Sequence, residues 1–459
     1  MGERERQYLR ILETVTEWDF INPAKELFQS YSCVVDKTFL SVTTHVTTPV
    51  LVSYVIWVLK DAKARGIETL LFVARDGLVM YKIAKILSDV WGMGIECRYF
   101  YASRYSLRLP LYVIDREYSL AKLCDPESGN CTVSAVLIAA GLNQEQRERV
   151  AFELTVDLDK RLCPNDLKKL KAKLKKSKAF ADLAQEVATR AYEGTKGYFR
   201  QEVPDSPQCF ALVDSGWSGS IQTSFGKLYE NIHGHAQAKL HGYYFGMLAT
   251  PQQDTGKYMG YLFSPKKNFS KFNKFCVDLF ECLCAANHGR VLGYSLVTDN
   301  NRWEPVLDAE IVYPGIVWDA GMQIKLCMEY ARKFAECHKK SKPVSLPNIK
   351  MVESLLRLFV NKPSKLEANI YGVIPFSRGV IEHDVGTLAR KMDANDWRHF
   401  SLLHRILGRL IRRVTPPPNP IFWIQGALAM SEASWLRRMD TKLLLTAYWI
   451  KMKVFSRPL

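Results

Sequence analysis

The strongest constraint on the fold is a pattern that occurs twice: a short apolar strand, a polar turn that contains glycine, and an apolar helix. The first copy is LLFVARDGLVMYKIAKIL, residues 70–87, and the second is CFALVDSGWSGSIQTSFGKLY, residues 209–229. Continuously apolar strands that alternate with helices through short loops are typical of a parallel sheet. The sequence therefore predicts an α/β protein with a Rossmann-like, mostly parallel sheet.

Further elements of the same kind surround the two copies. A helix is predicted over residues 49–65, and strands are predicted over residues 95–103 and 239–248. Because short loops connect them, we expect one sheet domain that is built from residues 45–110 and 205–262.

The rest of the chain has a different character. Residues 111–204 are charge-rich and mostly helical, which predicts a basic helical insertion, or a lid over the sheet. The proline-rich stretch VTPPPNP precedes a last basic segment. The expected remaining parts are an N-terminal leader with one helix (residues 1–44), a mainly helical C-terminal region (residues 263–413) and a basic amphipathic tail (residues 414–459).

Composition limits the class of protein and its partners. The chain has 459 residues, is 47% hydrophobic and carries a formal net charge of +16, so we expect a folded protein with an anionic partner. Its 11 cysteines lack zinc-site spacing, which favours reduced thiols. The longest apolar run, residues 49–59, is shorter than the roughly 20 residues that span a bilayer, so it predicts a buried helix. With no signal region at the N-terminus, we expect a cytoplasmic protein.

The turn GWSGS, residues 216–220, has three interpretations. It resembles the G-x-S-x-G nucleophile elbow of α/β-hydrolases, with Ser218 as nucleophile, although Ser220 stands in place of the last glycine. It also suits a phosphate cradle, because small residues and hydroxyls at a helix start leave N–H groups open to an anion. Asp214 then accepts hydrogen bonds from vicinal sugar hydroxyls. In the third interpretation the glycines shape a tight turn and Asp214 caps the helix.

The earlier turn adds cationic groups. Arg75, Asp76 and Gly77 follow a strand at the point where open α/β sheets bind ligands. An arginine there grips phosphate through paired donors. Arg98, Ser103, Arg104 and Arg108 follow the next strand, and of these we assign a role in the site to Arg104. Surface solvation or pairing with an acid is the structural alternative for these arginines.

The turns VARDG and LVDSGWSGS, in this order and with a basic insertion between them, resemble the type I phosphoribosyltransferases. That family places a pyrophosphate loop after an early strand, and a loop for the 5-phosphate of phosphoribosyl pyrophosphate after a later strand that ends in two acids. Here Ser215 replaces the second acid, Asp76 replaces the middle glycine of the first loop, and the phosphate turn is one residue shorter. The resemblance covers residues 65–250 and implies a sheet of phosphoribosyltransferase type.

Four motifs also resemble a bacterial family of polysaccharide-locus proteins, many of them labelled predicted hydrolases of the haloacid dehalogenase (HAD) superfamily. Three of the motifs are continuous: ARDG, SRYSLRLP and GWSGSIQ. The fourth consists of three short pieces, FE, NHG and GY, within residues 280–294. A phosphatase of that superfamily needs D-x-D-x-T after its first strand, whereas the D-x-D here, Asp157 to Asp159, precedes Lys160 in a helical region. We therefore attribute the label to a separate phosphatase domain in the relatives.

This resemblance implies a glycan ribofuranosyltransferase of capsule or O-antigen synthesis. Its donor is phosphoribosyl pyrophosphate, its acceptor a glycan or lipid-linked glycan, its cofactor Mg²⁺, and a separate phosphatase removes the 5-phosphate. A sugar hydroxyl attacks with inversion, and His241, Glu281 and His288 are candidates for the base. The implied catalytic residues are Arg75, Asp76, Arg104, Asp214, Glu281 and His288; the implied donor-binding residues are Gly77, Ser215, Gly216, Ser218, Gly219, Ser220 and Gln222; Asp76 and Asp214 are the implied metal ligands.

Two basic stretches suggest different partners. The lysine-rich residues 168–178 have no interleaved aromatic residues, so we expect a solvated helix face and no nucleic-acid binding. Residues 397–459 are basic and contain Trp, Tyr and Phe, which suits either peripheral contact with an anionic inner membrane or a helix packed on the core. Two other functions stay open: a hydrolase, either serine-based or phosphatase, and a non-catalytic module that anchors assembly partners.

Overall fold

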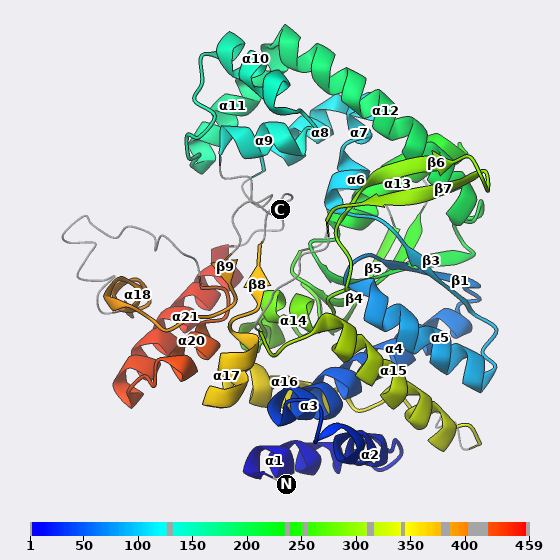
Figure 1. Cartoon of the computed structure of the whole chain (residues 1–459), viewed down its shortest axis with the longest axis vertical. Coiled ribbons are helices and arrows are strands. Elements are labelled where there is room, and N and C mark those ends of the chain that lie inside the picture. Colours follow the sequence, from blue (N-terminus) through cyan, green and yellow to red (C-terminus); the bar gives the residue numbers. More distant parts are fainter. Residues whose placement is uncertain are drawn as a thin grey trace.

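A five-stranded, all-parallel sheet in the order β2-β1-β3-β4-β5 organises the chain (Figure 1). The computed structural model describes residues 2–125, 132–234, 239–249, 251, 256–309, 316–340, 345–377, 386–402 and 421–455. The α/β, Rossmann-like fold class predicted from the two strand–turn–helix copies is confirmed. The strands are β1 (Thr69–Val73), β2 (Glu96–Phe100), β3 (Phe210–Trp217), β4 (Leu240–Met247) and β5 (Gly256–Phe263).

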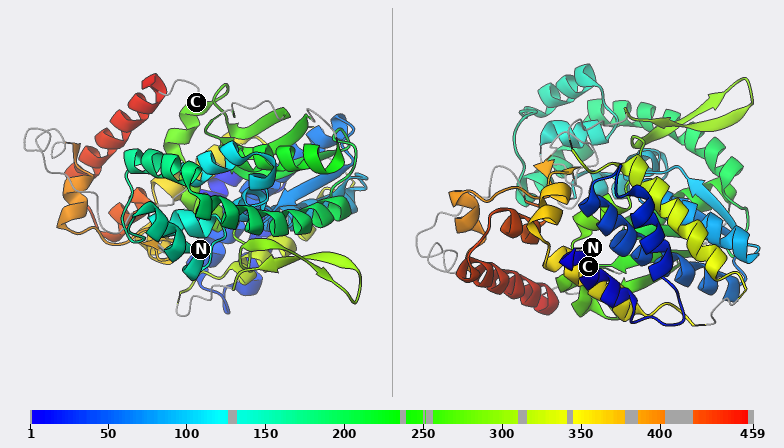
Figure 2. Two further views of the ribbon diagram at one scale, coloured as in Figure 1. Left: turned by 90° about the horizontal axis from the view of Figure 1, so that it is seen from above. Right: turned by 60° about the horizontal axis from the view of Figure 1, so that its bottom comes forward.

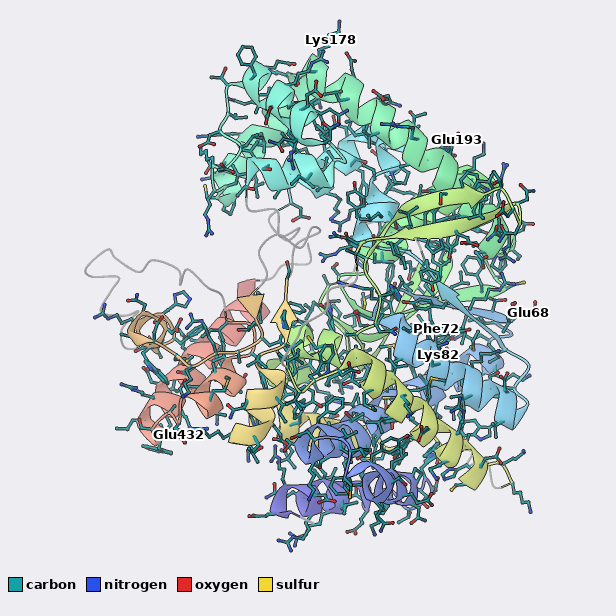
Figure 3. All side chains as sticks on the ribbon, in the orientation of Figure 1. Glu68, Phe72, Lys82, Lys178, Glu193 and Glu432 are labelled. Carbon is teal, nitrogen blue, oxygen red and sulfur yellow. The ribbon has the colours of Figure 1, made fainter. Side chains whose placement is uncertain are left out.

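Helices cover both faces of the sheet because alternate side chains of each strand point to opposite faces. Leu70 and Phe72 of β1 pack into a core with α4 (Thr48–Ala64), α5 (Gly77–Trp91) and α15 (Ala320–Cys337). Leu71 and Val73 pack on the other face, against α12 (Lys178–Glu202) and α13 (Ser220–His233). Figure 3 shows Phe72 inside the fold and Lys178 on the outer side of α12. Being buried on both faces explains why β1 is continuously apolar.

The most apolar helical stretch is a core helix. Residues Lys37–Ala64 form α3 (Lys37–Val42), one π-helical turn (Thr43–Thr47) and α4, and their mean hydropathy of 1.5 over an 18-residue window is high enough for a membrane span. However, 94% of that window is buried inside the protein. The apolar run 49–59 therefore forms the buried helix that its length predicted.

The N-terminal residues belong to the same core, which corrects the prediction of a leader with one helix. They form α1 (Glu3–Leu12), α2 (Ile21–Tyr31) and α3. Tyr8, Leu12, Trp18 and Phe20 are buried with the sheet-covering helices. The single-helix prediction was wrong because the apolar residues here are spaced widely and bury against partners that lie far away in the sequence.

The helical insertion stands over the carboxyl ends of the strands and has a hydrophobic core of its own (Figures 1 and 2). Most lysines of its α11 (Pro164–Lys176) are exposed, whereas Leu167, Leu170 and Leu174 are buried, so this helix has the solvated face that was predicted. The insertion consists of α7 (Leu111–Ile114), α8 (Arg116–Leu123), α9 (Val133–Ala139), α10 (Gln144–Leu154), α11 (Pro164–Lys176) and α12.

The C-terminal region is mainly helical, and it also contains an antiparallel hairpin, β6 (Val291–Val297) with β7 (Arg302–Leu307), that was not predicted. The hairpin packs on α12, where the ring of Tyr294 stacks on Tyr198 at 4.2 Å. Its side chains are half-exposed, so it lacks the apolar run that marks the buried strands. The helices of this region are α14 (Val277–Leu283), α15, α16 (Ile349–Asn361), α17 (Lys365–Tyr371) and α18 (Ala394–His399).

The last two helices differ in how they pack. The stretch before α20 (Ile424–Met430) is anchored in the core, since the Trp423 indole N–H donates to the carbonyl of Val360 at 2.8 Å. The helix α21 (Trp435–Phe455) lies at the outer edge of the molecule in both views of Figure 2. The proline-rich stretch expected as a linker, residues 414–420, lies outside the described residues.

Candidate functional site

The two turns singled out in the sequence meet at the carboxyl end of the sheet. β1 and β3 are parallel neighbours, so the turn Ala74–Asp76 lies beside Asp214–Gly219, the end of β3 and the turn after it, which we call the second turn. The Ser215 hydroxyl donates a 2.5 Å hydrogen bond to Asp76 Oδ2. Residues 139 positions apart in the sequence therefore form one site, as predicted for a ligand at the ends of parallel strands.

The second turn depends on two glycines. Gly216 has φ +132°, and a Cβ atom there would lie 2.0 Å from the carbonyl oxygen of Gly246 on β4. Gly219 has φ +68° and precedes the first residue of α13. Side chains at these positions would block the backbone path from β3 into α13, so the glycines fix the turn. The turn contains a cis peptide at Gly216–Trp217, and the first turn has one at Ala74–Arg75.

A third segment, α14, brings a carboxyl group to the second turn. The Trp217 indole N–H donates to Glu281 Oε1 at 2.8 Å. The same indole packs among the rings of Phe263, Phe275 and Phe280. Trp217 therefore orients the Glu281 carboxylate at the second turn.

Three acids share this site, and burial raises the pKa of each. The pKa of Asp214 rises to about 8, first through burial and then through the negative charge of Asp76. The pKa of Glu281 also rises to about 8, through burial and then through Asp76. Burial raises the pKa of Asp76 as well, although the Ser215 hydrogen bond and the charge of Arg75 oppose that rise. The acids therefore repel one another's ionised forms, and a bound cation would relieve this repulsion.

Two of these acids could hold Mg²⁺ together with a phosphorylated ligand. Within the described residues, no three His, Cys, Asp or Glu side chains are arranged as a protein-only metal site. Mg²⁺ usually binds through one or two carboxylates together with waters and substrate phosphates. Asp76 and Asp214 supply two carboxylates, so the pair suits a magnesium ion that also holds a phosphorylated ligand.

The predicted arginines lie beside the acids. The charge of Arg75 lowers the pKa of Asp76, and the charge of Arg104 lowers the pKa of Asp76, Asp214 and Glu281. Arg104 is the first residue of α6 (Arg104–Arg108), which Ser103 caps. The predicted residues Arg75, Asp76, Arg104, Asp214 and Glu281 thus act on one another electrostatically, as one site requires.

Arg108 joins the site as well, although it was not among the predicted site residues. It lies one turn after Arg104 on α6, and its Nη2 is 3.4 Å from the Ser220 hydroxyl at the start of α13. Its Nε is buried without a hydrogen-bond partner among the described residues. Burial, and then the like charge of Arg104, lower its pKa to about 10. The i, i+4 spacing of the two arginines was the available signal, but residues 103–108 were not recognised as a helix.

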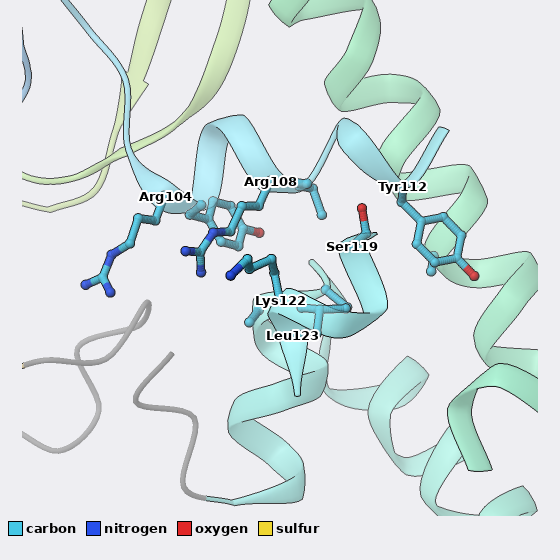
Figure 4. Close-up of a pocket in the computed structure, with 11 residues that line it drawn as sticks. Arg104, Arg108, Tyr112, Ser119, Lys122 and Leu123 are labelled. Atoms are coloured by element: carbon cyan, nitrogen blue, oxygen red, sulfur yellow. The ribbon is translucent and has the colours of Figure 1, made fainter. Parts of the chain in front are cut away.

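Arg104, Arg108 and Lys122 extend into one pocket between α6 and the helical insertion (Figure 4). Leu109, Leu123 and small alanines form most of the remaining wall. Three cations lie together at this pocket, which favours an anionic ligand.

The other predicted residues occupy different positions. Ser218 is exposed at the tip of the turn, and among the described residues it makes no hydrogen bond to a histidine or a carboxylate. The Gln222 side chain is fully buried, donates to the carbonyls of Leu240 and Lys257, and accepts from Tyr244. Its side chain hydrogen-bonds to residues of the sheet, so only the backbone of this predicted donor-binding residue remains near the turn.

The two histidine candidates are placed differently. His288 Nδ1–H donates to the Gly289 carbonyl, and His288 Nε2 accepts from the Tyr99 hydroxyl at 2.7 Å. The Tyr99 side chain lies near the first turn, since the charges of Asp76 and Arg75 act on its pKa. His241 pairs with Ala211 near the amino end of β4, three residues before the level of Asp214, or roughly 10 Å along the sheet. His241 therefore lies outside the site, which removes it from the candidate bases.

Neither the family models nor the curated proteins match this sequence. The assignment of chemistry therefore depends on the site itself.

Proposed function

We propose that the protein is a glycosyltransferase that transfers a 5-phosphoribofuranosyl group from phosphoribosyl pyrophosphate to a sugar hydroxyl and releases pyrophosphate. The observation that carries this proposal is the contact between Ser215 and Asp76, which joins an Arg-Asp-Gly turn to a small-residue turn at a helix start. A donor with a pyrophosphate at one end and a single phosphate at the other needs two such anion sites, with acids between them for the ribose.

The pyrophosphate end suits the first turn. Arg75 and Arg104 lie beside Asp76. Their positive charges would stabilise the negative charge that develops on the leaving group. Mg²⁺ held by Asp76 and Asp214 would supply Lewis-acid polarisation of the pyrophosphate oxygens. Ser215 keeps the Asp76 carboxylate turned toward the second turn.

The 5-phosphate end suits the start of α13. Backbone N–H groups at the first turn of this 14-residue helix point toward an anion, and Ser218 and Ser220 add hydroxyl donors. Arg108 adds a guanidinium that lies 3.4 Å from Ser220. Between the two ends, Asp214 faces the ribose hydroxyls, and the Tyr54 hydroxyl fixes its backbone through a 3.1 Å hydrogen bond to the Asp214 carbonyl.

Glu281 is the base in this proposal. Its pKa of about 8 lies close to the range in which a carboxylate removes a proton efficiently near neutral pH. It accepts the proton of the attacking sugar hydroxyl while the bond from the anomeric carbon to pyrophosphate breaks, and the attack from the opposite side inverts that carbon. Trp217 holds the carboxylate in place through the indole N–H.

The resemblance to polysaccharide-locus proteins directs the proposal to capsule or O-antigen synthesis. The acceptor is a glycan or lipid-linked glycan, the reaction takes place on the cytoplasmic side of the inner membrane, and a separate phosphatase removes the 5-phosphate afterwards. A serine hydrolase is disfavoured because Ser218 contacts neither a histidine nor an acid within the described chain.

The direct test is donor binding. We expect phosphoribosyl pyrophosphate with Mg²⁺ to raise the melting temperature of the protein, because a ligand that binds only the folded state stabilises it. Arg75→Ala should keep the fold and lose this rise. A melting temperature that does not respond to the donor in the wild-type protein would exclude the proposal.

A further inference from the structure

The helix α21 carries two separate apolar faces. One face packs on the protein: Thr441 and Leu444 are buried, and the amide N–H of Leu402 donates to Asp440 Oδ1 at 3.0 Å. The Arg437 guanidinium lies over the Trp397 ring at 4.6 Å. These contacts fix which side of the helix faces the protein.

The second face is a row of large apolar side chains that point to solvent. Their exposed fractions are 68% for Trp435, 70% for Leu436, 40% for Met439, 53% for Leu443 and 50% for Ile450. At about 100° per residue, these five positions lie within an arc of about 100°, on the side opposite the packed face. The first four residues extend over about 12 Å of helix, at about 1.5 Å per residue, and Ile450 lies on the same side two turns further on. We call it the apolar row of α21.

Such a row requires an explanation. Single exposed apolar residues are normal on soluble proteins, but a contiguous set of large ones marks a surface that another body covers. By contrast, Val34 and Phe152 are exposed singly, and the smaller group on the β6–β7 hairpin, Leu296, Val306 and Leu307, is only 37–44% exposed.

Charge identifies the occupant. Five basic residues and one acid, Asp440, occur in α21. Lys442 is exposed and adjoins the apolar row by its helical angle. The basic residues are Arg437, Arg438, Lys442, Lys451 and Lys453; of these, Arg437 belongs to the packed face and Arg438 donates to the carbonyls of Ala433 and Leu428.

The geometry points to an anionic lipid bilayer as the body that covers the apolar row of α21. A helix with a row of Trp, Leu, Met and Ile flanked by lysine and arginine lies in the bilayer interface, with its apolar side toward the acyl chains and its cations at the phosphates. A second copy of this chain would bring the same positive charges together. A nucleic acid would leave the aliphatic row unburied. This inference does not depend on the proposed transferase activity.

Vesicle flotation tests the inference with the full chain. We expect the wild-type protein to float with vesicles of equal parts phosphatidylcholine and phosphatidylglycerol, and at least fivefold less protein to float with phosphatidylcholine alone. The difference should shrink at high salt, which screens surface charge. Leu436→Ser with Leu443→Ser should lower the floating fraction at least fivefold without changing the melting temperature, since both side chains are exposed.

Two further variants sharpen the test. Lys442→Glu should weaken flotation with the anionic vesicles only. Phe152→Ser, which removes an exposed phenyl ring from α10, is the matched control and should float like the wild type. Equal flotation of the double-serine variant and the wild type would overturn the inference. So would a dimer in solution that the double-serine variant converts to a monomer, because a second copy would then cover the row.

Discussion

Ser215 donates a 2.5 Å hydrogen bond to Asp76, and this contact joins two turns that lie 139 residues apart in the sequence. Where a second acid would repel Asp76, the serine hydroxyl stabilises the ionised form of that carboxylate instead.

The first prediction concerns this contact. Ser215→Ala should weaken Mg²⁺-dependent binding of phosphoribosyl pyrophosphate by about 10- to 100-fold, because a hydrogen bond to a charged group contributes about 1.5–3 kcal/mol. Isothermal titration calorimetry measures the affinity. Ser32→Ala, at a half-exposed serine after α2, is the control. If Ser215→Ala binds as tightly as that control, the contact does not organise the donor site.

The second prediction concerns pH and the metal. Asp214 has a pKa of about 8 in the folded protein and about 4 when unfolded, so the folded state holds an extra proton between these values. Its contribution to stability therefore falls as pH rises from about 4 to about 8, and stays constant above that range. Asp214→Asn removes this contribution, so without metal the variant should gain stability relative to the wild type across that range, by up to a few kcal/mol.

Melting curves at several pH values check this expectation. Mg²⁺ competes with protons for the carboxylates, so with the donor present it should stabilise the wild type more at pH 8.5 than at pH 6, and the variant little at either. A wild-type-to-variant difference that does not change with pH would contradict the raised pKa of Asp214.

The third prediction concerns Arg108. Its pKa is lowered to about 10 by burial and by Arg104, so below that pH its charge destabilises the ligand-free fold. Arg108→Met should therefore raise the melting temperature of the free protein. It should also raise KM for the donor about 100-fold with a small change in kcat, because the phosphate contact is the same in the ground state and the transition state.

Lys175→Met is the matched control, since Lys175 is an exposed cation of the insertion that pairs with Glu117. This control should alter neither the melting temperature nor KM by a measurable amount. Loss of stability in Arg108→Met together with an unchanged KM would assign Arg108 a purely structural role.

The fourth prediction distinguishes the role of Glu281, the proposed base, from that of Trp217, which positions it. Glu281→Gln should lower kcat at least 100-fold, with donor affinity nearly unchanged, and should remove the acid limb near pH 8 from the pH profile. Trp217→Phe should keep activity and move that limb to higher pH, because the indole N–H stabilises the ionised carboxylate. A profile that is unchanged in Trp217→Phe would show that the hydrogen bond does not set the pKa.

The parallel sheet and both turns could be predicted because local pattern determines them. The apolar run of β1, the turn residues and the apolar helix α5 are adjacent in the sequence, and the same holds for β3 and α13. Burial on both faces demands continuous apolar strands, which makes this pattern easy to recognise.

Features that depend on distant partners could not be read in this way. Arg108 reaches Ser220 only because α6 turns back over α13, and Gln222 faces the sheet because Gly242 leaves room for its side chain. Likewise, the hairpin β6–β7 gains its burial from Gly194 and Gly197 on α12, where the backbone admits Tyr294 and Trp303. No residue near the hairpin in the sequence signals these contacts.

The last prediction tests the backbone of the second turn. Gly216→Ala should destabilise the protein by at least about 3 kcal/mol, since a Cβ atom would lie 2.0 Å from the Gly246 carbonyl oxygen and φ is +132°. Gly293→Ala on β6 is the matched control, because no atom lies within 4 Å of its Cβ position and its φ is ordinary. Chemical denaturation of both variants measures the difference. Equal stabilities would mean that β3 and β4 separate easily at Gly216, and the site would then lack the rigid turn on which the proposed donor binding depends.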